Sequence, residues 1–154
     1  DYEYPARESL PPLKLTWYDG GKQPKLLATL KDKDGKPLNW GSGHLFVGTQ
    51  GMILSNYGEH LLLPADKFAD FKRPEPFVPT SIGHHQEWIH AIKTGGSTTC
   101  NFDYSGALTE AVLLGVVAYR SGETLEWDSQ NLKVTNSSKA QEFIHQEYRK
   151  GWTL

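Results

Sequence analysis

The sequence predicts an α+β fold, with an open, mostly antiparallel or mixed β-sheet and two or three helices on one face. Three observations lead to this prediction: short strand patterns crowd the first half, two differently patterned helical segments follow between residues 81 and 120, and a third lies near the end. Strands that precede helices, rather than alternate with them, are typical of α+β domains. With 154 residues and 38% hydrophobic content, residues 1–154 are expected to form a single domain around one core.

The strand predictions depend on alternating apolar residues and on turn chemistry. Residues 13–18 alternate in this way and end at the turn Asp19-Gly20-Gly21. Tyr2 and Tyr4 alternate with acidic residues, in a strand edge whose partners we do not expect in this chain. Further short strands are predicted at residues 26–30, 44–47, 52–55 and 60–63, and Pro64 is expected to begin a brief helix through residue 71.

The first helical segment opens with a histidine pair, His84 and His85. At about 100° per residue, His85 shares a face with Trp88, Ile89 and Ile92, so it is predicted to point inward. The first turn of a helix has unpaired N–H groups and a positive dipole, which favour a neutral imidazole and a polar or anionic ligand. The alternative is that His85 is a hydrogen-bonded core residue without a functional role.

The second helical segment, residues 105–120, is apolar on nearly every side and is predicted to be a core helix buried on several sides. Its apolar run, residues 111–119, is far below the roughly 18 residues needed to span a bilayer. Two short strands at residues 123–128 and 132–134 should follow. A last helix is predicted over residues 138–150, because Ser138-x-x-Gln141 forms a capping box at its start.

Charge and histidine spacing argue against several function classes. A net charge of -2 with interspersed signs offers no basic stripe for nucleic acid and no polybasic patch for a membrane, so neither partner is expected. The six histidines invite a metal hydrolase, but none of the usual ligand spacings occurs, and no metal is predicted. The chain starts at Asp1 without a signal sequence, so we expect it to be part of a longer polypeptide, cytoplasmic or periplasmic.

Several longer segments resemble the C-terminal domain of the Gfo/Idh/MocA oxidoreductases, the family named for glucose-fructose oxidoreductase and inositol dehydrogenase. The similarity is to the bacterial subgroup common in Bacteroidetes and Planctomycetes. It covers the chain from about Tyr4 to the end and is weakest over residues 23–40. The matching segments are PARESLPPLKLTWYDGG, GHLFVGTQGMILSNYG, LLPADKFADF, GHHQEWIHAIKTG, NFDYSGALTEAVLLGVVAYRSGETLEWD and EYRKGW.

The resemblance implies the second half of a two-part enzyme. Members place an N-terminal Rossmann domain, which binds NAD or NADP, before an α+β domain whose open sheet lines the sugar site and joins subunits. The full-length enzyme would oxidise a secondary alcohol of a sugar or polyol. This chain would contact its own Rossmann domain and further copies of itself through the sheet face, as a homo-oligomer.

This chain lacks the parts that the family uses for cofactor binding and catalysis. The glycines at Gly41 and Gly43 precede a strand pattern rather than a helix, and the third glycine of a dinucleotide loop is missing. The family's Glu-Lys-Pro motif is also absent. Catalytic residues are therefore expected in the missing region, and the isolated chain is expected neither to bind a cofactor nor to transfer hydride.

Five residues are the candidate substrate contacts. Sugars need an aromatic surface for their C–H faces and convergent polar groups for orientation. Trp17 is the candidate stacking platform, although a position in the core is favoured over this role. For Asp19, a role in the turn is favoured over a contact with the sugar. Tyr18 could contact the ligand or a second subunit, and His84 and His85 complete the set. The competing function is a non-catalytic carbohydrate-binding or assembly domain.

Overall fold

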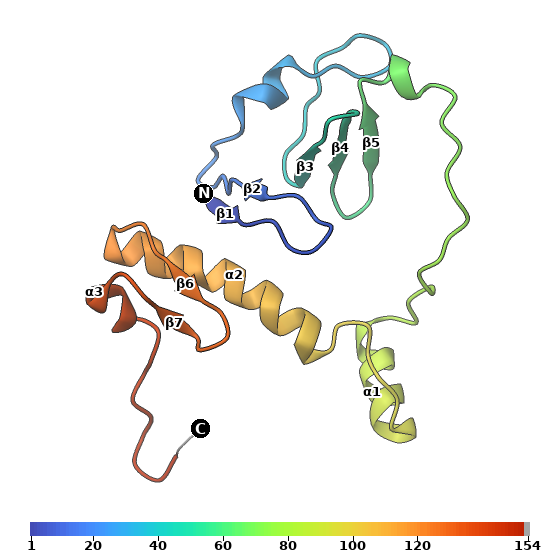
Figure 1. Ribbon diagram of the computed structural model, residues 1–154. Helices are drawn as coiled ribbons and strands as arrows, with labels where there is room; N and C mark the ends of the chain where they lie inside the picture. The colour runs from blue at the N-terminus through green and yellow to red at the C-terminus, as the bar shows by residue number, and fades with distance from the viewer. Residues whose placement is uncertain (153–154) are drawn as a thin grey trace. The chain divides into compact units, whose positions relative to one another are not determined.

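The computed structural model describes residues 1–152 and is an α+β fold with three helices and seven strands (Figure 1). The described strands form three small, open antiparallel sheets. This confirms the predicted fold class, but the strands do not join into one broad sheet. Two compact units divide the chain, Asp1–Pro76 and Phe77–Leu154. The single domain of residues 1–154 stays a prediction.

The first sheet is a two-stranded antiparallel ribbon of β1 (Tyr2–Tyr4) and β2 (Leu13–Leu15). The expectation that the first strand has no partner here was wrong, because Tyr2 pairs with Leu15 and Tyr4 with Leu13. Since paired residues share a face, these four apolar side chains line one side of the ribbon. The second strand ends at Leu15, three residues before the predicted end at Tyr18.

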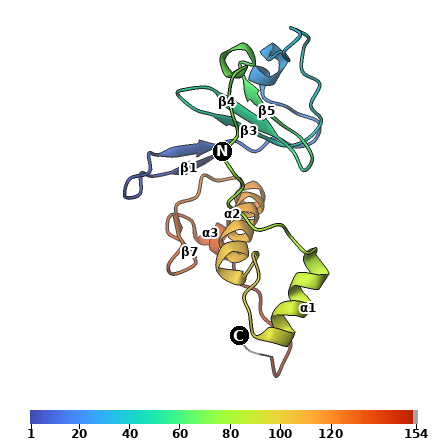
Figure 2. The same ribbon diagram turned by 90° about the vertical axis from the view of Figure 1, so that its right-hand side faces the viewer.

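The second sheet is the meander of β3 (His44–Val47), β4 (Met52–Ser55) and β5 (His60–Leu63), whose bounds are those predicted. The three strands lie side by side in both views (Figures 1 and 2). Gly48 N–H donates to Gly51 O over 2.9 Å to close the first hairpin. Strand register then separates two faces, because residues directly opposite each other point the same way.

One face of this meander is covered and carries the core of the first unit. Leu54 and Leu63, each 2% exposed, pack there against Leu27 and Leu30. Leu27 lies in the 3₁₀ helix η1 (Lys25–Thr29), where a strand was predicted over residues 26–30. A 3₁₀ turn brings side chains three residues apart to the same side, so both leucines reach the core; a strand would send them to opposite faces.

The brief helix predicted after the meander is present as η2 (Asp66–Phe68), a single 3₁₀ turn. Phe68, on that turn, lies beside Gly51, because a Cβ placed on this glycine would come within 2.6 Å of the Phe68 ring. A side chain at Gly51, which also has a φ of 158°, would therefore collide with η2. The turn of the first hairpin is thus tied to the segment that follows the third strand.

The second unit contains α1 (His84–Thr94), α2 (Phe102–Ser121), α3 (Ser138–Gln141) and the short pair β6 (Trp127–Asp128) and β7 (Lys133–Val134). Its core is small: Val117, Val134 and Ala140 are buried together. Figure 1 shows α3, β6 and β7 against the C-terminal half of α2, where Val117 lies.

Two helix predictions were wrong in extent or burial. The second helix starts at Phe102, because the Asn101 side chain caps it, and only Val117 and Ser121 are buried along its length. It is therefore not buried on several sides within the described chain. The last helix ends at Gln141 instead of continuing to residue 150, and its N-cap is Ser137, one residue before the predicted one. In the described part of the chain, no helix is long and apolar enough to cross a membrane.

Candidate functional site

The predicted site residues fall in two places in the chain. Trp17, Tyr18 and Asp19 follow β2 in the first unit, and His84 and His85 begin α1 in the second unit. The first three follow one another directly in the sequence. Convergence of the two groups on one ligand stays a prediction.

The aromatic pair after β2 is exposed. Trp17 is 58% exposed and Tyr18 is 47% exposed. The core position favoured for Trp17 was therefore wrong, and its indole is accessible as a stacking surface. Asp19 serves the turn, since its Oδ1 accepts a hydrogen bond from Gly20 N–H over 2.6 Å and its carbonyl accepts from Lys22 N–H over 3.2 Å.

The histidine pair occupies the first two positions of α1 and is exposed to solvent. The prediction that His85 points inward was wrong within the described chain, because no residue of α1 is buried. The apolar residues on its face are exposed with it, including Trp88 at 63% and Ile92 at 67%. The helix therefore presents an amphipathic face, with imidazoles at its N-terminal end and an indole one turn further on.

Glu87, which sequence reasoning did not single out, anchors the loop between the two long helices. Its Oε1 accepts hydrogen bonds from the Thr99 backbone N–H and from Thr99 Oγ1, the latter over 2.7 Å. These hydrogen bonds, with a smaller contribution from the nearby His84, lower the pKa of the Glu87 carboxyl. The residues are twelve apart, so no local pattern points to this contact. It fixes the loop against the turn that carries the histidines.

The outer face of the meander is another candidate for a functional role. The sequence predicted its three strands but not which of their side chains are exposed. Phe46, Ile53 and Leu62 stand opposite one another across the three strands, and His44, Ser55 and His60 form the adjacent row. Phe46 is 59% exposed and Ile53 is 43% exposed. No Asp, Glu, Lys or Arg side chain lies in these rows, and the row of Phe46, Ile53 and Leu62 is apolar.

Known proteins give no further guide to these features. No protein-family model, curated protein or solved structure matches the chain. The assignment of a function therefore depends on the residues themselves.

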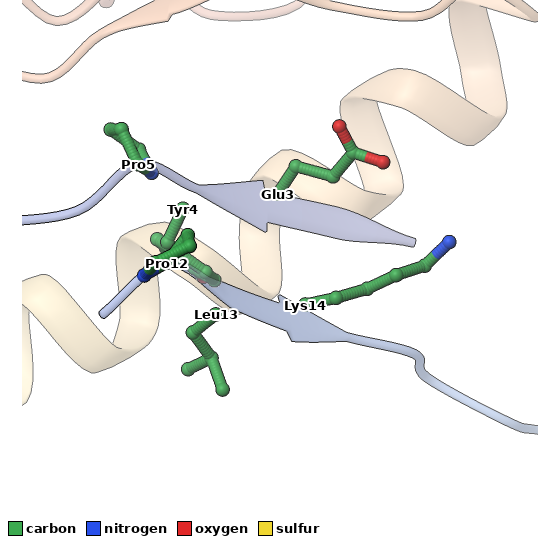
Figure 3. Close-up of a pocket in the computed structure, with 6 residues that line it drawn as sticks. All are labelled: Glu3, Tyr4, Pro5, Pro12, Leu13 and Lys14. Carbon is green, nitrogen blue, oxygen red and sulfur yellow. The ribbon is translucent and has the colours of Figure 1, made fainter.

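A shallow groove of about 510 Å³ lies along the β1–β2 ribbon (Figure 3). In Figure 3, Leu13 points away from the charged ends of Glu3 and Lys14, which lie on the other side of the ribbon. The remaining lining residues are Tyr4, Pro5 and Pro12. Lys14 Nζ lies 3.5 Å from Asp1 Oδ2. The groove has apolar rings but lacks a nucleophile with an adjacent base, so its chemistry is that of a contact surface.

Metal ligation is not supported by the side-chain positions in the described residues. Within residues 1–152, no group of three His, Cys, Asp or Glu side chains is arranged to hold an ion. Cys100, the only cysteine, is exposed.

Proposed function

We propose that this chain is the substrate-binding and subunit-interface domain of an NAD(P)-dependent oxidoreductase that acts on a secondary alcohol of a sugar or polyol. The resemblance of its longer segments to Gfo/Idh/MocA C-terminal domains supports the proposal. The observation that carries it in the structure is the outer face of the meander, where Phe46 and Ile53 of the apolar row are exposed within the described chain.

A second copy of the chain is the proposed partner of this face. In a two-fold dimer the same patch meets itself, so the patch must be compatible with its own image. An uncharged apolar row meets this condition, because it can face itself without like-charge repulsion. Apolar patches bounded by polar residues commonly mark interaction sites. Homo-oligomerisation through the sheet face follows from these properties.

The exposed apolar residues of the helices support a second interaction, with the Rossmann domain of the same polypeptide. On α2, Leu108, Leu113 and Val116 are each more than half exposed, and on α1 Trp88 and Ile92 are too. Helices that are apolar on several sides are normally buried on several sides. We therefore assign these surfaces to contacts with the nucleotide-binding half of the enzyme.

The dinucleotide does not fit the glycines of this chain. Gly43 has a φ of 150° and leads into β3 rather than into a helix, and a Cβ there would collide with Ser55 O and lie 2.8 Å from Trp40 Nε1. Its lack of a side chain thus serves the packing of Trp40 against the sheet. NAD or NADP would be held by the Rossmann domain, and we assign no step of hydride transfer to residues of this chain.

The proposed role of this chain in catalysis is to bind and orient the substrate. Trp17 and Tyr18 offer exposed rings for the C–H faces of a sugar. His84 and His85 lie in the first turn of α1, where their ring nitrogens can form hydrogen bonds with hydroxyl groups. The alternative, a non-catalytic carbohydrate-binding or assembly domain, uses the same exposed rings and predicts no NAD(P)⁺ reduction by the complete protein.

Steady-state kinetics of the complete protein tests the proposal. NAD(P)⁺ reduction is followed at 340 nm with a panel of sugars and polyols, in the wild type, His85→Ala and the control His90→Ala. His85→Ala should lower kcat/KM by roughly tenfold or more, while His90, in the middle of the same helix, should be replaceable with little loss. Equal small effects would remove the histidine from the site. A complete protein without any sugar-dependent reduction would refute the oxidoreductase function.

A further inference from the structure

A second pocket in the first unit is lined by none of the candidate sugar contacts, but it shares His60 with the outer face of the meander. Its volume is about 440 Å³, and it is as shallow and open as the groove along the β1–β2 ribbon. Three distant segments meet there: Trp40 before β3, the β4–β5 turn with the start of β5, and Arg73 after η2. The lining residues are Trp40, Gly58, Glu59, His60, Leu61 and Arg73. They combine a flat indole, an aliphatic side chain, a carboxylate, a guanidinium and an imidazole.

The rim of this pocket is held in place by local hydrogen bonds. Asn56 Oδ1 accepts from the N–H groups of Gly58 and Glu59 over 2.9 and 2.8 Å, and Asn56 N–H donates to Glu59 O over 2.9 Å. On the other side, Gln23 Nε2 donates to Trp40 O over 2.7 Å, and the Trp40 ring packs against the leucine core. The carboxylate and the indole are therefore presented from fixed backbone, which lowers the entropic cost of binding.

The charged groups of the pocket are available to a ligand. Neither Glu59 nor Arg73 takes part in an ion pair among the described residues. The contact of Glu59 Oε2 with Asn56 Nδ2 is long, at 3.4 Å. The carboxylate and the guanidinium have opposite charges, so Glu59 repels an anion and Arg73 repels a cation. A neutral ligand with several hydroxyl groups can use both, by donating to the carboxylate and accepting from the guanidinium.

From this geometry we infer that the pocket binds a neutral pyranoside, with vicinal hydroxyl groups between Glu59 and Arg73 and its C–H face against Trp40 and Leu61. The site differs from the candidate contacts at Trp17 and at the histidine pair. It needs no nucleotide and no Rossmann domain. Its existence is therefore independent of the oxidoreductase function.

Indole resonances provide a specific test. Trp40 Nε1–H is buried without an acceptor among the described residues, whereas Trp127 Nε1–H donates to Glu110 Oε1 over 2.6 Å in the other unit. We would titrate the ¹⁵N-labelled chain with methyl α-D-glucopyranoside and record ¹H–¹⁵N spectra. The Trp40 indole signal and the amides of residues 58–61 should shift saturably, and the Trp127 indole should not move.

Three variants and a second compound make the test decisive. Arg73→Ala and Glu59→Gln, both exposed positions, should abolish the shifts while the rest of the spectrum stays unchanged. The adjacent cation provides the matched control, because Lys72 does not line the pocket and Lys72→Ala should bind normally. Cyclohexanol, a ring with a single hydroxyl group, should not saturate. No saturable shift, equal shifts with cyclohexanol, or binding that survives both pocket variants would overturn the inference.

Discussion

Replacing Phe46 by lysine should dissociate the proposed homo-oligomer. Phe46 lies at the end of the apolar row on the outer face of the meander and is 59% exposed. Of a side chain with roughly 200 Å² of accessible surface, about 120 Å² would be covered in the dimer. At about 25 cal/mol per Å², that burial contributes about 3 kcal/mol per copy. Since each 1.4 kcal/mol changes Kd tenfold, Phe46→Lys should weaken association by at least about a hundredfold.

The assay is sedimentation velocity over a wide concentration range, with Phe77→Lys as the matched control. Phe77 is 89% exposed and lies in the connector before α1, outside any strand. The same substitution there adds the same charge without touching the row. Because the core of this unit lies on the opposite face, the circular dichroism spectrum of Phe46→Lys should equal that of the wild type. A monomeric wild type, or equal association of the two variants, would refute the reasoning.

Two further hydrogen-bonded contacts, Glu87 with Thr99 and Glu110 with Trp127, give measurable expectations. Because the pKa of Glu87 is lowered by its hydrogen bonds with Thr99, the anchor should be complete above the ordinary value of 4.5 and lost as pH falls through the lower folded-state pKa. The Thr99 amide shift should therefore titrate below pH 4.5, and Glu87→Gln should remove that titration. Glu110→Ala leaves the partly buried Trp127 N–H without its acceptor, which should cost about 1–3 kcal/mol in urea unfolding. The cost should be smaller in a Trp127→Phe background, and an equal cost in both backgrounds would show that this hydrogen bond does not contribute.

The meander could be predicted to the residue because its signals are local. Each of its three strands is a short apolar segment that ends at a glycine turn, an Asn-Tyr-Gly turn or Pro64. Turn chemistry of this kind fixes strand ends independently of what the sheet packs against. The left-handed end of α1 at Gly95, with a φ of 68°, has the same local origin.

Predictions that needed the tertiary partner of a segment were less successful. The pattern over residues 138–150 is amphipathic, but only its first turn is helical, and Phe143 and Ile144 pack on the small core from turn conformations. The guanidinium carbon of Arg120 lies 4.2 Å from the centroid of the Phe143 ring, within the range of a cation–π contact. Amphipathic periodicity indicates which side chains seek burial, and packing then decides the backbone that buries them.

For the candidate sites, the sequence likewise predicted the types of residue that are suitable, but not where these residues lie in the structure. The sequence identified Trp17 and the histidine pair as residue types suited to bind a sugar. It did not predict that they are exposed, because the exposure of a side chain depends on which other segments cover it. The Glu87–Thr99 anchor joins residues twelve apart, and the pocket of Trp40 and Arg73 joins segments thirty-three residues apart. Contacts at such separations leave no spacing pattern in a single sequence.

The errors in predicted burial share one direction, and this bears on function. Trp17, the face of α1 and most of α2 were each expected to be covered, and each is exposed within the described chain. An apolar pattern indicates that a segment is stable when its apolar side chains are buried. The surface that buries them can belong to the same chain or to another polypeptide. If the outer face of the meander meets a second copy and the helices meet a nucleotide-binding domain, the exposed apolar side chains are buried in the assembly. On that proposal, the surplus of apolar surface belongs to interfaces with other polypeptide rather than to the core of this chain.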